Sequence, residues 1–386
     1  MRILFVSNGS NWGGACVALL NLIHGLKLYG HDIAVFVPEK KGRFVDELHH
    51  CNVKCFVASH KYGNTIIPKT SNKIKYIKQY IEKYIRLILA RYDFNKVINV
   101  YKPDLVHTNV GPLDIAFTIC QKKGIPHVWH MREYQDLDFN MTFMPSKKSF
   151  IKKIHSAGNY NIAITKGIFD HWHLREIEDQ VIYDPVISST DMTNVELEKE
   201  NIMLIVGRIE PAKGQLNLLY AWKEFVKMNP EYRLLIVGSE KADVKYTRQC
   251  VLYVKQNNLE DNVSFLGERN DVYQLMRKAK ALIVASRNEG FGFITSEAMY
   301  NNCIVIGYNT AGTKEQFDNG LVDSGSEIAL RFLNQSELLY NLDFVKKNDC
   351  SLMIKNARNV VAGKYTIEKS AYNVDLFYKK ILNRNE

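Results

Sequence analysis

The chain has 386 residues, of which 46% are hydrophobic and 24% are charged. This length allows two domains, and this composition excludes a disordered, collagen-like or disulfide-stapled protein. The net charge of +10 is concentrated, because residues 61–102 alone carry ten Lys and Arg against two Asp and Glu. Such a local excess of positive charge indicates an anionic partner for that segment.

Targeting signals and cysteine usage point to the cytoplasm. No run of 18 apolar residues is present, so a membrane-spanning helix is not expected. The first six residues are predicted to form a strand, and they lack the layout of a signal peptide. The seven cysteines include no CxxC pair, which favours reduced thiols in a cytoplasmic protein.

The first half of the chain alternates short apolar runs with longer amphipathic segments. Residues 2–7 are a predicted strand, followed by a loop with Gly13 and Gly14 and by a helix that ends near Gly30. A strand, a helix and a second strand in succession form a right-handed parallel unit. Further strands are predicted at residues 31–38, 53–58, 104–109, 127–132 and 160–166.

Residues 71–92 are predicted to form a basic amphipathic helix. Two interpretations of this helix remain open. Its apolar face packs into the core, or the helix lies near an anionic membrane surface. Nucleic acid is not an expected partner, because no recognition motif accompanies the charge. The apolar face consists of Ile74, Ile77, Ile81, Tyr84, Ile85 and Ile88, and Lys75, Lys78, Glu82 and Arg86 lie opposite.

The second half repeats the alternation after a polar stretch at 193–201. Strands alternating with helices in both halves predict an α/β chain with two doubly wound domains. Ligands of such sheets bind beyond the carboxyl ends of the strands, so two facing domains predict a ligand in the cleft between them. The second set of strands is predicted at 201–207, 233–238, 263–267, 281–286 and 303–309.

The predicted domain boundaries follow from this alternation. Residues 1–190 are predicted to form the N-terminal domain, and residues 191–365 the C-terminal domain. A last helix within 366–386 is expected to pack back on the N-terminal domain.

Two glutamates flank a glycine-rich turn in RNEGFGFITSE, residues 287–297. Glu289 is expected in the loop after the strand at 281–286, and Glu297 one to two turns into the next helix. Amide groups at the start of a helix suit phosphate or sugar oxygens, and carboxylates accept hydrogen bonds from vicinal hydroxyls. The pair indicates a site for a sugar and a ribose, while an ordinary charged helix start stays open as the alternative.

Two cations follow the strand at 201–207 in VGRIEPAKG, residues 206–214. The guanidinium of Arg208 and the ammonium of Lys213 can together neutralise a diphosphate leaving group. Taken alone, the two side chains also fit ordinary surface cations.

In this order and spacing, the two clusters resemble the retaining glycosyltransferase family 4, whose fold is GT-B with two Rossmann-like domains. The family carries a GR…KG motif, matched by Arg208 and Lys213, and a motif of two spaced glutamates, matched by Glu289 and Glu297. The resemblance implies that residues 1–190 are the acceptor-side domain and residues 191–365 the nucleotide-sugar-binding domain. It implies that the cations bind the donor diphosphate, that Glu289 contacts donor-sugar hydroxyls and that Glu297 contacts the ribose. It also implies a sugar and phosphate site lined by the backbone of Gly290, Phe291, Gly292 and Phe293.

Other segments match the family more loosely. Gly13 and Gly14 stand where the family's glycine loop approaches the phosphate and the acceptor. His130 stands where the family carries a histidine near the donor sugar. The segment 310–320 resembles a small-residue loop of the family. The DLD string at 136–138 is interpreted as loop carboxylates, and no metal is expected.

The resulting prediction is a retaining, metal-independent glycosyltransferase without a cofactor, in which His130, Arg208, Lys213 and Glu289 are the catalytic residues. A UDP-sugar is the favoured donor. The basic segment 61–102 favours a lipid-linked or polysaccharide acceptor in cell-surface glycan synthesis and a peripheral position at the inner face of the membrane. Two alternatives stay open: a non-catalytic GT-B partner subunit and a nucleotide-sugar epimerase.

Overall fold

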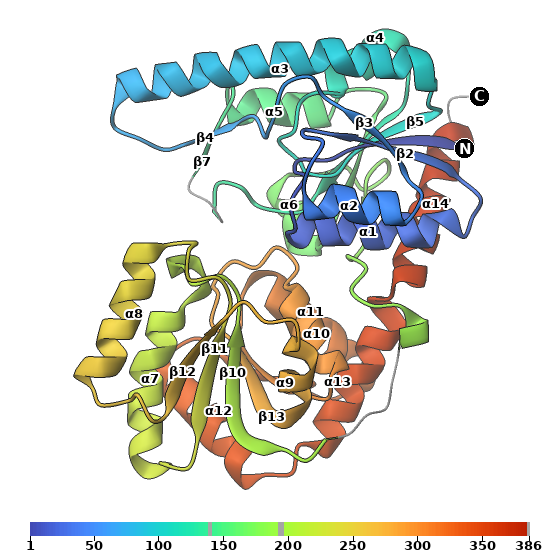
Figure 1. Cartoon of the computed structure of the whole chain (residues 1–386). Coiled ribbons are helices and arrows are strands. Elements are labelled where there is room, and N and C mark those ends of the chain that lie inside the picture. The colour runs from blue at the N-terminus through green and yellow to red at the C-terminus, as the bar shows by residue number, and fades with distance from the viewer. Residues whose placement is uncertain (138–140, 192–196, 384–386) are drawn as a thin grey trace. The chain divides into compact units, whose positions relative to one another are not determined.

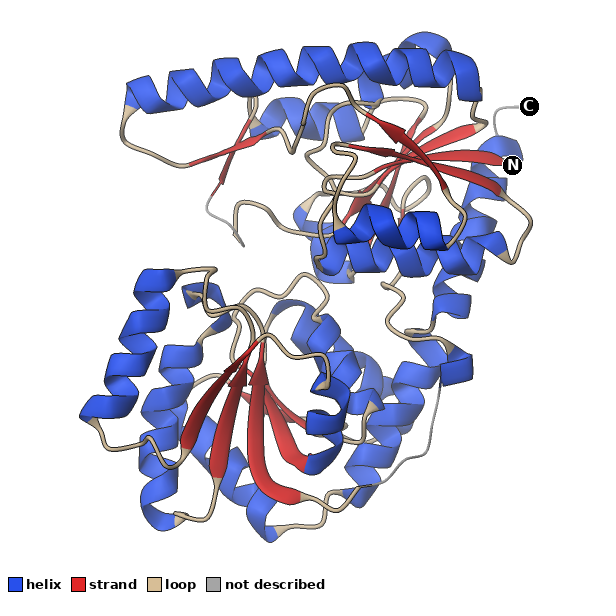
Figure 2. Ribbon diagram, in the orientation of Figure 1, coloured by secondary structure: helices blue, strands red, loops and turns tan. Residues whose placement is uncertain are grey.

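A computed structural model describes residues 1–137, 141–191 and 197–383. The chain consists of two compact units (Figure 1): unit 1 comprises Met1–Ser188 and Thr366–Glu386, and unit 2 comprises Ser189–Tyr365. Each unit has a parallel sheet with helices on both faces (Figure 2). The α/β fold class with two doubly wound sheets, predicted from the alternating pattern, is therefore confirmed.

Unit 1 is built on a seven-stranded parallel sheet with the order β3-β2-β1-β5-β6-β8-β9. The order reverses between β1 and β5, so the loops after these two strands diverge at a topological switch point. The sheet strands are β1 (Arg2–Val6), β2 (Asp32–Val37), β3 (Lys54–Val57), β5 (Leu105–Thr108), β6 (His127–Met131), β8 (Asn159–Ala163) and β9 (Gln180–Val181). A separate antiparallel pair consists of β4 (Ile66–Pro68) and β7 (Met141–Phe143).

Helices cover both faces of the unit 1 sheet. The last helix of the chain belongs to this unit and packs against the first, because Gly25 brings the two together: a Cβ there would lie 2.4 Å from that of Ala371. The helices are α1 (Gly14–Lys27), α2 (Arg43–His50), α3 (Lys73–Tyr101), α4 (Phe117–Lys123), α5 (Lys147–Ile154), α6 (Lys166–His171) and α14 (Ile367–Asn383).

The two halves of helix α3 differ in how far their apolar side chains are buried. Its second half is held by the core through Leu87, Ala90 and Phe94, which are buried. Its first half runs out over β4 and β7 (Figure 1) and leaves the predicted apolar face in solvent. The interpretation that this face packs into the core is therefore wrong. The exposed fractions are 81% for Ile74, 56% for Ile77, 53% for Ile81, 49% for Tyr84, 52% for Ile85 and 48% for Ile88.

Unit 2 is built on a six-stranded parallel sheet with the order β12-β11-β10-β13-β14-β15. Its order reverses between β10 and β13, which makes the loops after these strands the expected ligand-binding edge. The strands are β10 (Glu200–Val206), β11 (Arg233–Val237), β12 (Val263–Gly267), β13 (Ala279–Val284), β14 (Ile304–Tyr308) and β15 (Leu330–Phe332). The helices are α7 (Gln215–Met228), α8 (Val244–Gln256), α9 (Val272–Lys278), α10 (Phe293–Tyr300), α11 (Ala311–Ser324), α12 (Gln335–Lys347) and α13 (Ser351–Lys364).

The segment 310–320 is not a loop, because α11 begins at Ala311 and runs through it. Part of the polar stretch 193–201 lies outside the described residues. None of the helices in the described part of the chain is long and apolar enough to cross a membrane.

Candidate active site

The predicted donor residues of unit 2 meet at its switch point. Arg208 and Lys213 lie in the loop after β10, and Glu289 lies in the loop after β13. The Nζ atom of Lys213 is 2.6 Å from Oε1 of Glu289. The Arg208 side chain pairs with Glu210 at 2.9 Å and keeps 59% of its surface exposed. This edge therefore offers one cation bound to the opposite loop and one that solvent or a ligand can reach.

Backbone geometry fixes the loop after β10. Gly214 has a φ of +73°, and a Cβ at this position would lie 2.5 Å from the carbonyl oxygen of Ala285. Only glycine fits such a left-handed conformation at so close an approach. The ends of β10 and β13 are consequently held together, and Lys213 is placed beside Glu289.

The glycine-rich turn before α10 is held by α11. Gln316 donates a hydrogen bond from Nε2 to the carbonyl oxygen of Phe291 at 2.6 Å and to that of Gly292 at 3.1 Å. The backbone N–H of Gly312 donates to the carbonyl oxygen of Glu289 at 2.9 Å. The turn is thus organised before any ligand arrives, and α10 begins at Phe293 without a side-chain cap on its N-terminal amides.

The two phenylalanines of this turn, Phe291 and Phe293, have different environments. The Phe291 side chain is 2% exposed and packs on Tyr365, with ring centroids 5.1 Å apart. Phe293 lies edge-on to it at 5.8 Å. Since Phe291 is buried, the turn can offer a ligand backbone groups there and not that ring.

Glu297 lies in the second turn of α10. Tyr273 of α9 donates a hydrogen bond from its hydroxyl to Oε1 at 3.3 Å. Burial raises the pKa of Glu297, and the hydrogen bond from Tyr273 opposes that shift only in part. A carboxylate held in a poorly solvated place can bind hydroxyl groups strongly, because little water competes for it.

Unit 1 contains a buried polar network at the carboxyl end of β5 and β6. His107 Nδ1 lies 2.5 Å from the hydroxyl of Tyr378, and His107 Nε2 lies 3.1 Å from His130 Nδ1. The guanidinium of Arg132 lies 3.2 Å from the same Nδ1 and also pairs with the buried Asp184. Burial lowers the pKa of both histidines, and the charge of Arg132 lowers each further.

The partners of His130 determine where its proton lies. An arginine can only donate, so the Nδ1 atom that Arg132 faces must accept. His107 then donates from Nε2, and Tyr378 donates to Nδ1 of His107. Neutral His130 therefore carries its hydrogen on Nε2, where no hydrogen-bond partner is present in the described residues. Oδ1 of Asp184 is 3.9 Å from that nitrogen.

Gly13 and Gly14 lie in the loop after β1 and at the start of α1. Neither is among the residues with positive φ, and a Cβ on either would meet no atom within 4 Å. Neither backbone conformation nor packing within the chain calls for glycine here.

The DLD string does not assemble a metal site within the described residues. Asp136 pairs with Lys147 at 2.6 Å and with His171 at 2.9 Å. Asp138 lies outside the described residues. No group of three or more His, Cys, Asp or Glu side chains suited to a metal is found in the part of the chain that the structure describes.

The structure brings the predicted residues together in two sets. Arg208, Lys213, Glu289, the turn 290–293 and Glu297 lie along one edge of unit 2, whereas His130, Gly13 and Gly14 belong to unit 1. Sequence reasoning missed the supporting residues Gln316 and Asp184. One-dimensional spacing does not reveal which backbone or guanidinium these side chains reach.

Residues 189–360 match the family model named "Glycosyl transferases group 1". Unit 2 is therefore similar to the glycosyl transferases of group 1 over nearly its whole length. This match covers the GR…KG loop, the glycine-rich turn and both glutamates, so the motif resemblance found in the sequence is confirmed for this domain.

Curated relatives extend the similarity beyond the glycosyl transferase domain. The chain is 26% identical over 325 residues to the Escherichia coli protein named UDP-Gal:alpha-D-GlcNAc-diphosphoundecaprenol alpha-1,3-galactosyltransferase, covering 75% of this chain and 79% of that one. It is 22% identical to the alpha-monoglucosyldiacylglycerol synthase of Acholeplasma laidlawii, covering 96% and 94% of the two chains.

Solved structures give the same fold over the whole chain. A glycosyltransferase of Rickettsia africae ESF-5 matches with a TM-score of 0.77 and 18% identity, covering 99% of this chain and 98% of the other. Anabaena HepE in complex with UDP matches with a TM-score of 0.77 and 17% identity, covering 98% and 100%. The chain thus has the GT-B fold, and the match to the family model falls within its second unit.

Proposed function

We propose that the chain is a retaining glycosyltransferase that moves a sugar from a UDP-sugar to a hydroxyl of a lipid-linked glycan in bacterial surface-glycan synthesis. The observation that carries this proposal is the edge of unit 2, where Lys213 and Glu289 pair at 2.6 Å beside Arg208 and the uncapped start of α10. UDP in a structure of the same fold and the diphosphate-linked acceptor in the name of the E. coli relative support the choice of donor and acceptor.

The proposed chemistry follows the movement of charge. The bond between the anomeric carbon and the diphosphate breaks, and a bond from that carbon to the acceptor oxygen forms. The acceptor proton passes to the leaving diphosphate. Arg208, Lys213 and the amides at the start of α10 stabilise the negative charge that develops there. Glu289 orients the sugar hydroxyls, and Glu297 binds the ribose.

Calorimetric titration of the purified chain with UDP, GDP, ADP and dTDP tests the donor site. We expect UDP to bind and the Arg208→Ala variant to lose at least tenfold in affinity. Arg248→Ala, which removes an exposed cation of α8 in the same unit, is the matched control and should bind UDP as the wild type does. Absence of binding to all four nucleotides would favour the non-catalytic partner subunit. Conversion of the UDP-sugar without an acceptor would favour the epimerase.

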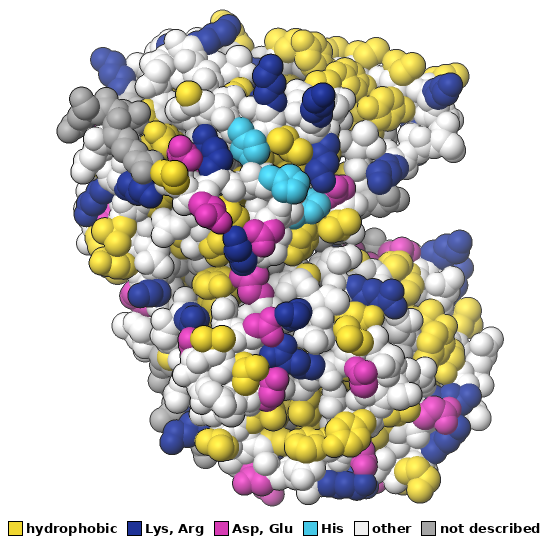
Figure 3. All heavy atoms as spheres, turned by 180° about the vertical axis from the view of Figure 1, so that it is seen from behind, with side chains coloured by type: hydrophobic (Ala, Val, Ile, Leu, Met, Phe, Trp, Pro, Cys, Tyr) yellow, Lys and Arg dark blue, Asp and Glu magenta, His cyan; other side chains and the backbone are white. Residues whose placement is uncertain are grey.

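We also propose that the first half of α3 attaches the protein to an anionic membrane. Six large apolar side chains lie in solvent on one face of this helix, from Ile74 to Ile88. Figure 3 shows hydrophobic side chains gathered along the upper edge of the molecule, with basic ones among them. A monomeric surface seldom exposes so many neighbouring apolar residues without a partner.

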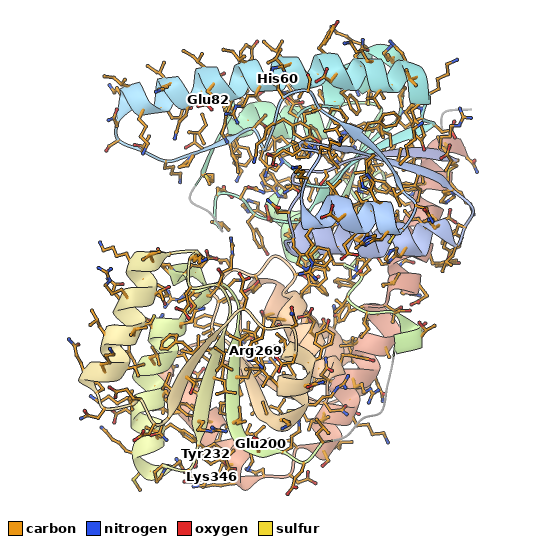
Figure 4. The ribbon with its side chains drawn as sticks, viewed as in Figure 1. His60, Glu82, Glu200, Tyr232, Arg269 and Lys346 are labelled. Carbon is orange, nitrogen blue, oxygen red and sulfur yellow. The ribbon has the colours of Figure 1, made fainter. Side chains whose placement is uncertain are left out.

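The charges on α3 favour a lipid partner. Lys73, Lys75 and Lys78 are exposed near the N-terminus of the helix, and the first turn has no acidic residue. Cations at this end oppose the helix dipole, so they weaken the isolated helix. Glu82, labelled in Figure 4, forms an ion pair with Arg86 at 2.6 Å and so neutralises a charge farther along the helix. An anionic surface would attract the three lysines, at about 1 kcal/mol per residue.

Co-sedimentation with vesicles tests this attachment. We expect binding to phosphatidylglycerol vesicles that falls steeply with salt, and little binding to phosphatidylcholine alone. The double variant Ile77→Ser with Ile81→Ser should weaken the partition by about 10- to 30-fold, since each side chain inserts about half its surface. Val322→Ser, which changes an 82% exposed residue of unit 2, should have no effect. Salt-insensitive binding, or binding unchanged in the double variant, would overturn the proposal.

A further inference from the structure

One tryptophan of the chain is exposed. Of the four tryptophans, Trp129, Trp172 and Trp222 are fully buried, whereas Trp12 keeps 40% of its surface in solvent. Trp12 lies in the loop between β1 and α1, directly before Gly13, and thus at the carboxyl edge of the unit 1 sheet. A large aromatic side chain left in solvent at a ligand-binding edge is typical of a recognition surface.

The loop that carries Trp12 is tied to the neighbouring loop after β2. The N–H of Phe44 donates to the carbonyl oxygen of Ser10 at 3.1 Å, and the Ser10 hydroxyl lies 3.2 Å from the carbonyl oxygen of Glu39. Gly42 has a φ of +144°, and a Cβ there would lie 2.3 Å from the Ser10 carbonyl oxygen. These contacts place the start of α2 beside Trp12. The Cζ atom of Arg43 is 4.4 Å from the centroid of the indole ring.

Positive charge distinguishes the surface around Trp12 and Arg43 from an ordinary apolar surface. Lys40 and Lys41 are exposed in the same loop as Arg43. The acidic residue of that loop, Glu39, is engaged by Lys61 at 2.7 Å. Beside the ring, Gly13 and Gly14 leave open space, because a Cβ on either would touch nothing within 4 Å.

We propose that Trp12 and Arg43, together with Lys40 and Lys41, form the acceptor subsite, and that it takes a sugar joined to a diphosphate. The apolar face of the sugar ring stacks on the indole, as sugars and other flat apolar faces do on aromatic rings. The diphosphate lies on the guanidinium and the two ammonium groups. Gly13 and Gly14 give the acceptor room to approach the chain. This inference rests on the proposed transferase function and names the acceptor's chemical class.

Acrylamide quenching of tryptophan fluorescence gives a direct test, because Trp12 is the exposed indole. Three water-soluble probes separate the contributions: citronellyl diphosphate-linked N-acetylglucosamine, the same sugar as a citronellyl glycoside, and citronellyl diphosphate without a sugar. We expect the complete probe to protect Trp12 from quenching and to bind at least tenfold more tightly than either partial probe. In the Arg43→Ala variant, the complete probe should bind no more tightly than the glycoside that lacks the diphosphate.

Kinetics of transfer to the complete probe complete the test. Trp12→Phe and Arg43→Ala should raise the KM for the acceptor about tenfold while leaving the calorimetric affinity for UDP unchanged. Tyr340→Phe, at a 69% exposed aromatic of unit 2, is the matched control and should change neither quantity. Unprotected Trp12 fluorescence, or an acceptor KM unchanged in both variants while UDP still binds, would overturn this inference alone. Loss of UDP binding in the wild type would instead overturn the proposed function beneath it.

Discussion

The two units place a ligand-binding edge at the same point of the same topology but build it differently. In unit 2 the edge is fixed by the backbone, because Gly214 and Gly292 adopt positive φ and the charged side chains Lys213 and Glu289 meet across the loops. In unit 1 the glycines of the corresponding first loop have open space around them. Its charged partners, Arg132 and Asp184, are buried beneath the loops.

The two units therefore differ in where their glycines and their charged side chains lie. Unit 2 uses its glycines to shape its own backbone and places Lys213, Glu289 and the exposed Arg208 at the loop edge. Unit 1 has its charges buried around His130 and open space around its glycines, which under the proposed function would leave room for a ligand. Under the proposed function, the same doubly wound scaffold would bind a charged donor with one unit and receive a bulky acceptor with the other.

The largest effect is expected at the charge pair of unit 2. Lys213→Ala should lower kcat/KM by a hundredfold to a thousandfold, about 3–4 kcal/mol, because one fixed charge on the diphosphate is lost. Lys227→Ala removes an ion-paired lysine of α7, 2.7 Å from Glu224, and serves as the control with unchanged kinetics. Wild-type turnover in the Lys213→Ala variant would remove the assignment of this edge as the donor site.

Two glycine-to-alanine substitutions, one in each unit, are expected to have opposite effects on the free energy of unfolding. Gly214→Ala should destabilise the fold by about 2–4 kcal/mol, because its φ is positive and its Cβ would strike the carbonyl of Ala285. Gly14→Ala should leave the free energy of unfolding unchanged or raise it by up to about 1 kcal/mol, since alanine favours a helix. Urea denaturation measures both changes.

Activity should follow the opposite pattern at Gly14. If a ligand approaches this position, the added methyl group of Gly14→Ala lowers kcat/KM about tenfold in a protein that is at least as stable. Full activity in this variant would mean that the open space at the start of α1 serves no ligand, and the contrast between the two units would disappear.

The strands of both units could be predicted from the sequence, and so could the candidate site of unit 2, whereas the buried polar network of unit 1 could not. The GR…KG and paired-glutamate spacings survive in one dimension because each motif lies within one loop and the helix that follows it. Asp184 and Tyr378 could not be found in this way, because they reach Arg132 and His107 from segments far away in the chain. The apolar face of α3 was recognised by its period, but periodicity alone cannot tell a core-facing stripe from one that faces solvent.

A smaller effect is expected from Glu297, a half-buried carboxylate of unit 2. Burial raises the pKa of Glu297 above its ordinary value of 4.5. The folded chain then binds a proton more readily than the unfolded chain, so wild-type stability is lost as the pH rises from 4.5 through the raised pKa. Glu297→Gln has no such charge to bury. Its free energy of unfolding should exceed that of the wild type increasingly across this window and converge with it at lower pH.

The same variant should lose about tenfold in affinity for UDP, because an amide accepts fewer hydrogen bonds from ribose hydroxyls than a carboxylate does. Glu260→Gln, at an exposed position after α8, is the control and should show neither change. A Glu297→Gln variant that binds UDP as the wild type does would leave the burial of this carboxylate without a functional reason.

The position of the ring proton of His130 in unit 1 can be tested without measuring a rate. Because Arg132 can only donate to Nδ1 of His130, long-range nitrogen–proton NMR should find His130 as the Nε2–H tautomer, with Nδ1 bare. Burial lowers the pKa of His130 below its ordinary value of 6.5, so the ring should stay neutral at pH 6 and above. Resonances are assigned with His130→Gln and His107→Gln. A hydrogen on Nδ1, or an imidazolium at pH 6, would contradict the network, whereas the Nε2–H tautomer would make Nε2 of His130 a hydrogen-bond donor.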